Sequence, residues 1–223
     1  MKFKIEKNPY DKRQLFPKST IELNPNQISC FVGCNGTGKS TIIWLIQDRL
    51  RHQYKAKEIA TEAFHHKLKN TDSEYCYLNF DKRSEESLDE EYFMFKAHIA
   101  YQSTGEGIIY RFGKKLALLG DFIRKPENAG KKLFIFFDDC DAGTSIDAIQ
   151  DIKDVFNLIT EDCAKHNITY YFIITANAFE MCRDLDCISI HNFKHMRFDN
   201  YEDFKKFVLS SRKIKDKQEN EEK

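Results

Sequence analysis

A glycine-rich stretch at residues 33–41, with the sequence GCNGTGKST, constrains the fold of this chain more than any other feature. It follows an apolar run at residues 28–32 and precedes an amphipathic segment that starts at Ile42, so it joins a predicted strand to a predicted helix. The stretch fits the pattern G-x-x-x-x-G-K-[ST] in the strand–loop–helix context that this pattern requires. Backbone N–H groups of such a loop point inward, and the positive end of the following helix dipole points to the same place. The loop therefore predicts a phosphate-binding site, with a simple glycine turn before a helix as the alternative.

The residues of this loop can be given separate roles in binding a nucleoside triphosphate. Lys39 would reach the β- and γ-phosphates as a point charge, and the Ser40 hydroxyl would hold the Mg²⁺ that bridges them. We therefore predict ATP and Mg²⁺ as ligands. The other loop residues predicted to line the phosphate cradle are Gly33, Cys34, Asn35, Gly36, Thr37, Gly38 and Thr41.

The size and composition of the chain fit one globular domain. Its 223 residues, 41% of them hydrophobic, can bury one sizeable core. Lysine plus arginine and aspartate plus glutamate both number 35, so no net charge draws the chain to nucleic acid or to an anionic membrane, although a local basic patch could still bind DNA. The apolar runs are too short to span a bilayer and the first residues lack the apolar core of a signal peptide. We expect a cytoplasmic protein with no membrane contact.

Seven cysteines are present, an odd number without a C-x-x-C pair, which argues against both a disulfide framework and a redox motif. Four residues near the C-terminus, Cys182, Cys187, His191 and His195, could be zinc ligands. The gap between the two cysteines is wider than in a usual zinc knuckle. Ordinary residues that flank a strand are therefore the favoured interpretation.

A second apolar strand ends in two acidic residues. Residues 133–137 are all apolar, as in a buried parallel strand, and Asp138 and Asp139 follow directly. Ligands of open α/β sheets bind at this end of the strands. Asp138 is thus the predicted holder of Mg²⁺, directly or through water, and Asp139 the predicted residue that orients or deprotonates the attacking water. A solvated turn is the alternative for two adjacent acids.

The rest of the chain alternates between predicted strands and helices. Residues 3–5 and 19–23 predict an antiparallel lead-in, in which Tyr10 or Phe16 could stack on adenine or could simply be core residues. Further strands are predicted at 75–80, 168–175, 187–190 and 194–198. Helices are predicted at 42–50, with a weaker continuation to 68 that leaves one helix or two open, and at 85–99, 108–124, 146–165 and 201–211. The polar residues 212–223 predict a disordered tail after a single domain at 1–211.

A second loop of small residues, QSTGEG at 102–107, precedes the predicted helix 108–124. The same N–H and dipole argument makes it a second candidate anion site. One nucleotide does not need two such anion-binding loops, so the second loop would bind a different ligand.

Taken in order, these motifs resemble the ABC ATPase fold over nearly the whole chain up to about residue 210. Residues 33–41 look like its Walker A loop, 103–106 like its signature loop, 136–139 like Walker B and 144–147 like the D-loop. In this family two subunits meet head to tail, and each nucleotide is clamped between the Walker loops of one and the signature loop of the other. The resemblance therefore implies an ATP-dependent homodimer in which Ser103, Gly105 and Glu106 contact the partner's nucleotide. It also implies an α/β P-loop fold with a mostly parallel central sheet, a small N-terminal antiparallel β-lobe and a short helical signature subdomain at about 84–126.

Several positions depart from the family pattern. Asp139 stands where a glutamate is usual, although the RecF-like branch also carries an Asp-Asp pair, so we expect slow hydrolysis. The switch histidine is missing after strand 168–175, and Asn177 stands near its place, where it could orient the γ-phosphate. No convincing Q-loop glutamine is found. Because the interval from Ser40 to Ser103 is short and has no coiled-coil insertion, the compact, soluble RecF-like and OLD-like branch is the most similar.

The sequence thus predicts an ATP-hydrolysing enzyme whose nucleotide-dependent dimerisation controls a partner protein or DNA. A role in DNA repair, in a mobile element or in anti-phage defence is implied only by analogy of fold. The alternatives are a P-loop kinase of small molecules, the ATP-binding subunit of an ABC transporter, and a nucleotide-binding regulator that barely hydrolyses. The kinase would need an arginine-rich lid that is not evident, and the short helical region disfavours the transporter subunit.

Overall fold

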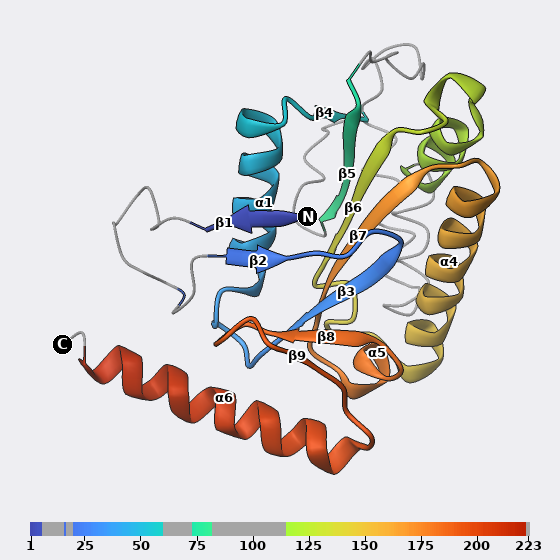
Figure 1. Ribbon diagram of the computed structural model, residues 1–223. Helices are drawn as coiled ribbons and strands as arrows, with labels where there is room; N and C mark the ends of the chain where they lie inside the picture. The colour runs from blue at the N-terminus through green and yellow to red at the C-terminus, as the bar shows by residue number, and fades with distance from the viewer. Residues whose placement is uncertain (6–15, 17–19, 60–72, 82–114, 222–223) are drawn as a thin grey trace, which may run out of the picture.

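A seven-stranded, mostly parallel sheet runs through the middle of the molecule (Figure 1). The computed structural model describes residues 1–5, 16, 20–59, 73–81 and 115–221. Strand order in the sheet is β4-β5-β6-β7-β3-β8-β9, with β8 and β9 antiparallel and the other neighbours parallel, while β1 and β2 form a separate antiparallel pair. The strands are β1 (Lys2–Lys4), β2 (Thr20–Glu22), β3 (Gln27–Val32), β4 (Lys57–Glu58), β5 (Tyr75–Asp81), β6 (Lys132–Asp138), β7 (Thr169–Ala176), β8 (Asp186–Ser189) and β9 (His195–Met196). The predicted α/β class, the parallel sheet and the antiparallel lead-in are confirmed.

Helices lie on both faces of this sheet. Figure 1 shows α1 and α4 on opposite sides of the strands. The helices are α1 (Lys39–Gln53), α4 (Ile146–Lys165), α5 (Phe179–Cys182) and α6 (Tyr201–Glu221), with a 3-10 turn η1 (Pro126–Asn128); residues 115–124 are also helical.

The core is divided in two by the sheet, because successive strand residues point to opposite faces. On β6, Phe134 and Phe136 pack with α1 and the N-terminal pair, whereas Ile135 and Phe137 pack with α4. Strands β3 and β7 alternate in the same way. Burial on both faces is the reason why these strands are almost continuously apolar.

Strand order brings the candidate site residues to one edge of the sheet. The glycine-rich loop follows β3, the two acids lie at the end of β6, and Asn177 follows β7. Strand β7 lies between β3 and β6 and is parallel to both. The three carboxyl ends therefore meet at the edge where α/β proteins bind ligands.

The C-terminal segment corrects one expectation. The closing helix does not end at Ser211, because α6 continues to Glu221, and the prediction of a disordered tail is wrong for residues 212–221. These residues are rich in lysine, glutamate and glutamine, which are good helix formers as well as typical of disorder. Contacts of Ser211 and Lys215 with the glycine-rich loop also tie this part of the helix to the domain.

Other bounds differ in smaller ways. Helix α1 ends at Gln53 and is followed by β4, so the weak helical pattern beyond residue 53 does not extend it. Helix α4 has the bounds that its apolar periodicity predicts. Of the expected signature subdomain at about 84–126, residues 84–114 lie outside the described residues.

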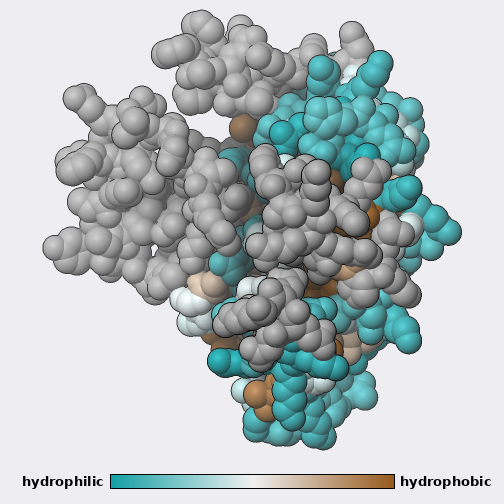
Figure 2. All heavy atoms as spheres, turned by 90° about the vertical axis from the view of Figure 1, so that its left-hand side faces the viewer, coloured by the Kyte–Doolittle hydropathy of each residue, from teal (hydrophilic) through white to brown (hydrophobic). Residues whose placement is uncertain are grey.

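The described surface on one side of the molecule is mainly hydrophilic, with apolar atoms in small separate groups (Figure 2). Single exposed apolar side chains are usual on a folded protein. Among the helices that the structure describes, none combines the length and the apolar character needed to cross a bilayer.

Candidate nucleotide-binding site

The loop between β3 and α1 has a backbone that its glycines make possible. Gly38 stands at the N-terminus of α1 with φ +91°, in a region that side chains other than glycine rarely adopt. A Cβ atom on Gly33 would lie 2.6 Å from Ile190 Cγ2, which is too close for atoms to pack. Helix α1 itself, all of which is described, has neither a side-chain cap nor an acidic residue in its first turn. Its positive end therefore faces the loop without a neutralising carboxylate on the same helix.

Lys39 lies inside this loop. Its Nζ donates to the carbonyl oxygens of Gly33 at 2.9 Å and Cys34 at 3.3 Å, and the residue is 8% exposed. Burial lowers the pKa of Lys39, and the negative carboxylates that follow β6 act in the opposite direction. An ammonium group has three N–H donors. Two are directed at the loop carbonyls, which leaves the third for a further acceptor.

Thr175, near the end of β7, bonds to both Asp138, the last residue of β6, and Asp139, the residue after it. Thr175 Oγ1 donates to Asp138 Oδ1 at 2.7 Å and accepts from the backbone N–H of Asp139 at 2.8 Å. Asp139 has φ +58°, an uncommon backbone conformation that the Thr175 hydrogen bond helps to hold. Thr175 therefore fixes the carboxylate of Asp138 and the backbone of Asp139. Sequence analysis missed this role, although a polar residue near the end of an apolar strand was a usable signal.

Asn177 connects Asp139 to a third acid, Asp141, which sequence analysis also missed. Asn177 Nδ2 donates to Asp139 Oδ1 at 2.7 Å and to Asp141 Oδ1 at 3.0 Å. Asp141 Oδ2 accepts from the backbone N–H groups of Asn177 at 2.7 Å and Ala178 at 2.8 Å. Burial raises the pKa of Asp141, whereas these hydrogen bonds lower it. Asp141 thus anchors the turn between β7 and α5 beside the other two acids.

Helix α6 reaches the glycine-rich loop from the far end of the chain. Ser211 Oγ accepts from the backbone N–H of Cys34 at 2.9 Å, and Lys215 Nζ donates to the carbonyl oxygen of Asn35 at 3.4 Å. No motif marks these two residues, because their role depends on where α6 packs.

The predicted site residues are placed as follows. Residues 33–41, Asp138, Asp139 and Asn177 lie at the same edge of the sheet, whereas Ser103, Gly105 and Glu106 lie outside the described residues. Tyr10 also lies outside them. Phe16 is 4% exposed and its ring centroid lies 5.6 Å from that of Phe193, so it is a core residue that packs beside the loop.

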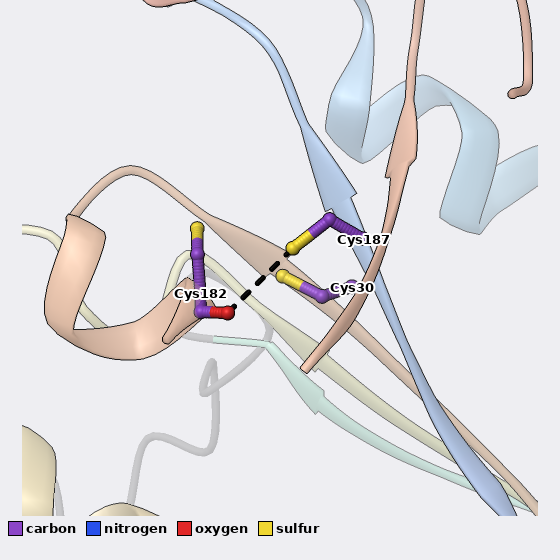
Figure 3. A group of neighbouring side chains, drawn as sticks. All are labelled: Cys30, Cys182 and Cys187. Atoms are coloured by element: carbon purple, nitrogen blue, oxygen red, sulfur yellow. Dashed lines mark hydrogen bonds between the residues drawn. The ribbon is translucent and has the colours of Figure 1, made fainter. Parts of the chain in front are cut away.

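The four residues considered as zinc ligands do not come together. His191 Nε2 pairs with Ser211 Oγ at 2.6 Å, and His195 Nδ1 pairs with Asp186 at 2.7 Å. Instead, Cys182 and Cys187 lie with Cys30, and their sulfur atoms are within 4.8 Å of one another (Figure 3).

This three-thiol cluster packs as part of the core. The Cys187 thiol donates to the carbonyl oxygen of Cys182 at 3.7 Å, and burial raises the pKa of Cys30. A closed zinc site takes four ligands. Within the described ranges no fourth histidine, cysteine or acid joins the three thiols, so the favoured interpretation of ordinary strand-flanking residues fits the geometry better than zinc.

Comparisons with known proteins identify the fold. No protein-family model matches the sequence, and no curated protein sequence matches it. The structure of MJ1267, an ATP-binding cassette of an ABC transporter, is 14% identical with a TM-score of 0.50, and the match covers 96% of each chain. MJ1267 in its ADP conformation is 15% identical with a TM-score of 0.46, covering 95% of this chain and 98% of that one. Another ATP-binding subunit of an ABC transporter is 14% identical with a TM-score of 0.46, covering 89% and 90%. The first of these matches shows that the chain has the α/β fold of an ABC ATP-binding cassette.

Proposed function

We propose that the chain binds ATP with Mg²⁺ at the loop between β3 and α1 and hydrolyses the ATP slowly. The observation that carries this proposal is the position of Lys39, whose ammonium lies between two loop carbonyls and in the field of the carboxylates that follow β6. A buried cation next to an unneutralised helix N-terminus is suited to a polyphosphate. The cassette fold is consistent with this ligand.

The donor set beside Lys39 fits magnesium. Asp138 offers a carboxylate and Ser40 a hydroxyl, and Mg²⁺ prefers such hard oxygen ligands and usually retains several waters. We assign these two residues to the ion, which would supply positive charge to offset that of the phosphates. Thr175 supports the assignment, because its hydrogen bond orients Asp138 towards the same edge.

Asp139 is the proposed catalytic residue for hydrolysis. One of its carboxylate oxygens accepts from Asn177, so the other can accept a proton from the attacking water. The water oxygen forms a bond to the γ-phosphorus while the bond from that phosphorus to the β–γ bridging oxygen breaks, which gives ADP and inorganic phosphate. An aspartate is one methylene shorter than the usual glutamate, which supports a slow reaction.

Head-to-tail dimerisation would complete the site. Ser103, Gly105 and Glu106 are proposed to contact the nucleotide of a partner subunit, with the signature subdomain at about residues 84–126. Ile146, which starts α4 and belongs to the D-loop-like residues 144–147, is 67% exposed, which supports a contact surface there. We propose the compact RecF-like and OLD-like branch, a cytoplasmic location and a single ATPase domain over residues 1–211, to which α6 adds residues 212–221.

The biological output is proposed to be control of a partner protein, with DNA as a second possible target. The basic pair Lys205 and Lys206 on α6 gives DNA little support, because these lysines form ion pairs with Glu202 and Asp203. A second run that contains basic residues, at 111–115, is described only at Lys115.

The test of the ATPase is to measure Mg-ATP affinity and phosphate release for Lys39→Ala beside Lys57→Ala, a change of an exposed lysine on edge strand β4. We expect Lys39→Ala to weaken ATP binding about 100-fold, or about 2.7 kcal/mol, and to abolish phosphate release, with Lys57→Ala unchanged. Phosphate release in the absence of any acceptor other than water separates an ATPase from a kinase. Unchanged binding in Lys39→Ala would refute the site.

A further inference from the structure

Helix α6 packs against the turn between β3 and α1. Figure 1 shows α6 crossing below the end of the sheet, beneath the segment that joins these two elements. Its contacts with the loop join residues that are 177 and 180 positions apart in sequence. Helix α6 packs into the core through Phe204, Phe207 and Val208, and it also makes polar contacts with the backbone of the glycine-rich loop, which packing alone does not require.

Ser211 is the centre of these contacts. It is 1% exposed, and its oxygen accepts from the backbone N–H of Cys34 while it lies 2.6 Å from His191 Nε2. A hydroxyl can accept one hydrogen bond and donate another. If Ser211 donates its proton to Nε2 of a neutral His191, both hydrogen bonds are made. The hydroxyl then joins three segments: the loop, the residues after β8, and α6.

The Cys34 end of this link lies next to Lys39. The carbonyl oxygen of Cys34 accepts from Lys39 Nζ at 3.3 Å and from Thr37 Oγ1 at 2.8 Å. Ser211 holds the N–H of the same residue. A shift of Cys34 would therefore move an acceptor of the phosphate-binding lysine. Ser211 is thus placed to act on the nucleotide through the loop and not by touching it.

Lys215 stands one turn further along the same face of α6. Its Nζ lies 3.4 Å from the carbonyl oxygen of Asn35, and a Cβ atom on Gly36 would be 2.9 Å from it. Lys215 is partly exposed, so its long side chain can turn from the carbonyl to a stronger acceptor. Lys215 thus brings a second cation to the tip of the loop, beside Asn35 and Gly36.

We propose that α6 is a working part of the nucleotide site, in which Ser211 is a positioning residue for the loop and Lys215 a cation that favours the triphosphate over the diphosphate. This inference rests on the proposed function, because it assumes that the loop binds ATP. Docking of α6 and binding of nucleotide stabilise the same loop conformation, so each strengthens the other by the same factor.

The test compares matched variants on the same helix. Ser211→Ala is paired with Ser210→Ala, and Lys215→Ala with Lys213→Ala, since Ser210 and Lys213 are exposed neighbours. Calorimetric titrations use the non-hydrolysable ATP analogue AMP-PNP and ADP, both with magnesium, and amide hydrogen exchange is followed over residues 201–221. Ser211→Thr, which retains the hydroxyl, serves as the conservative rescue.

We expect Ser211→Ala to weaken binding of both nucleotides about tenfold, with Ser211→Thr close to wild type. Lys215→Ala should lower the preference for the triphosphate severalfold and leave ADP affinity nearly unchanged. Nucleotide should slow amide exchange in α6 of the wild type and less so in Ser211→Ala. The two control variants should behave as wild type.

Equal affinities in Ser211→Ala, Lys215→Ala and wild type would overturn this inference and leave the proposed function standing. A wild-type chain that binds neither nucleotide would overturn the proposed function, and this inference with it. If Ser211→Ala does not fold, the exposed Lys215 and the exchange of α6 in the wild type still decide the question.

Discussion

Thr175 connects the side chain of Asp138 to the backbone of Asp139 at the end of β6. Its hydroxyl donates to one acid and accepts from the backbone of the next, and it is 1% exposed. Asp139, whose backbone it holds, has a positive φ. A single hydroxyl thus fixes the carboxylate of Asp138 and supports the uncommon backbone conformation of Asp139.

We expect Thr175→Val to lower the ATP turnover rate at least about tenfold, because the isosteric side chain leaves both partners without the hydroxyl. The unpaired buried groups should also lower the free energy of unfolding by about 1–3 kcal/mol. Thr175→Ser, which retains the hydroxyl, should recover most of the turnover rate and most of the free energy of unfolding. The measurements are steady-state phosphate release and denaturant unfolding; equal turnover in the valine and serine variants would contradict the role.

One buried carboxylate, that of Asp141, holds the turn between β7 and α5. Asp141 accepts from two consecutive backbone N–H groups and from the side chain of Asn177, so it holds the start of α5 against the end of β6. Motion of this turn would move Asn177 relative to Asp139. The turn therefore connects fold stability to the geometry of the proposed catalytic residue.

Asp141→Ala should lower the free energy of unfolding by about 2–3 kcal/mol, because two half-buried backbone N–H groups lose their acceptor and the buried carboxylate is removed. Asp151→Ala, a change of an exposed acid on α4, should have little effect. Urea unfolding of both variants checks the prediction. If the two variants unfold at the same urea concentration, Asp141 is not an anchor.

The elements differ in how well the sequence predicts them. Helix α4 has its predicted bounds because its apolar face repeats regularly between clear breaks, and β6 is nearly as clear because it is buried on both faces. The phosphate loop and the two acids are also predictable, since their residue types have few other uses in that order. Helix α6 beyond Ser211 could not be predicted from the sequence. Its polar composition fits both disorder and helix, and the contacts with the loop that favour helix are non-local. Asp141 and Thr175 were missed for the same reason, as their partners lie more than 30 residues away in sequence.

The whole molecule is expected to change its association state with nucleotide. Asp139→Asn should bind ATP but not hydrolyse it, so it should hold the closed dimer that the wild type opens after hydrolysis. Light scattering should then give a mass near 26.3 kDa without nucleotide and twice that with Mg-ATP. Asp184→Asn is the matched control, because Asp184 also has positive φ but is exposed. A constant monomer mass with ATP bound would favour a regulator or kinase that acts as one subunit.

Alkaline pH should destabilise the whole fold through β5. Burial raises the pKa of Tyr77 to about 12 and that of Cys76 to about 11, above their ordinary values. The folded state therefore holds the protons of the Tyr77 hydroxyl and the Cys76 thiol more tightly than the unfolded chain does. The contribution of these two groups to the free energy of unfolding is complete below about pH 9 and is lost as the pH rises to about 12. The free energy of unfolding should fall by about 1.4 kcal/mol per pH unit for each group within its range. Urea midpoints at pH 8 and 10.5 test this, and Tyr77→Phe should reduce the difference; a flat profile would contradict it.

The hydrogen bond between Cys34 and Ser211 also determines when the site is finished during synthesis. The two residues are 177 positions apart, so at about 5–20 residues per second the loop is made about 9–35 seconds before its partner. Strand β3, the loop and α1 can form early from local contacts, but the Cys34 N–H meets its acceptor only after the ribosome has made the first half of α6. A nascent chain that stalls before Ser211 would carry the complete glycine-rich motif and still lack the contact that fixes it.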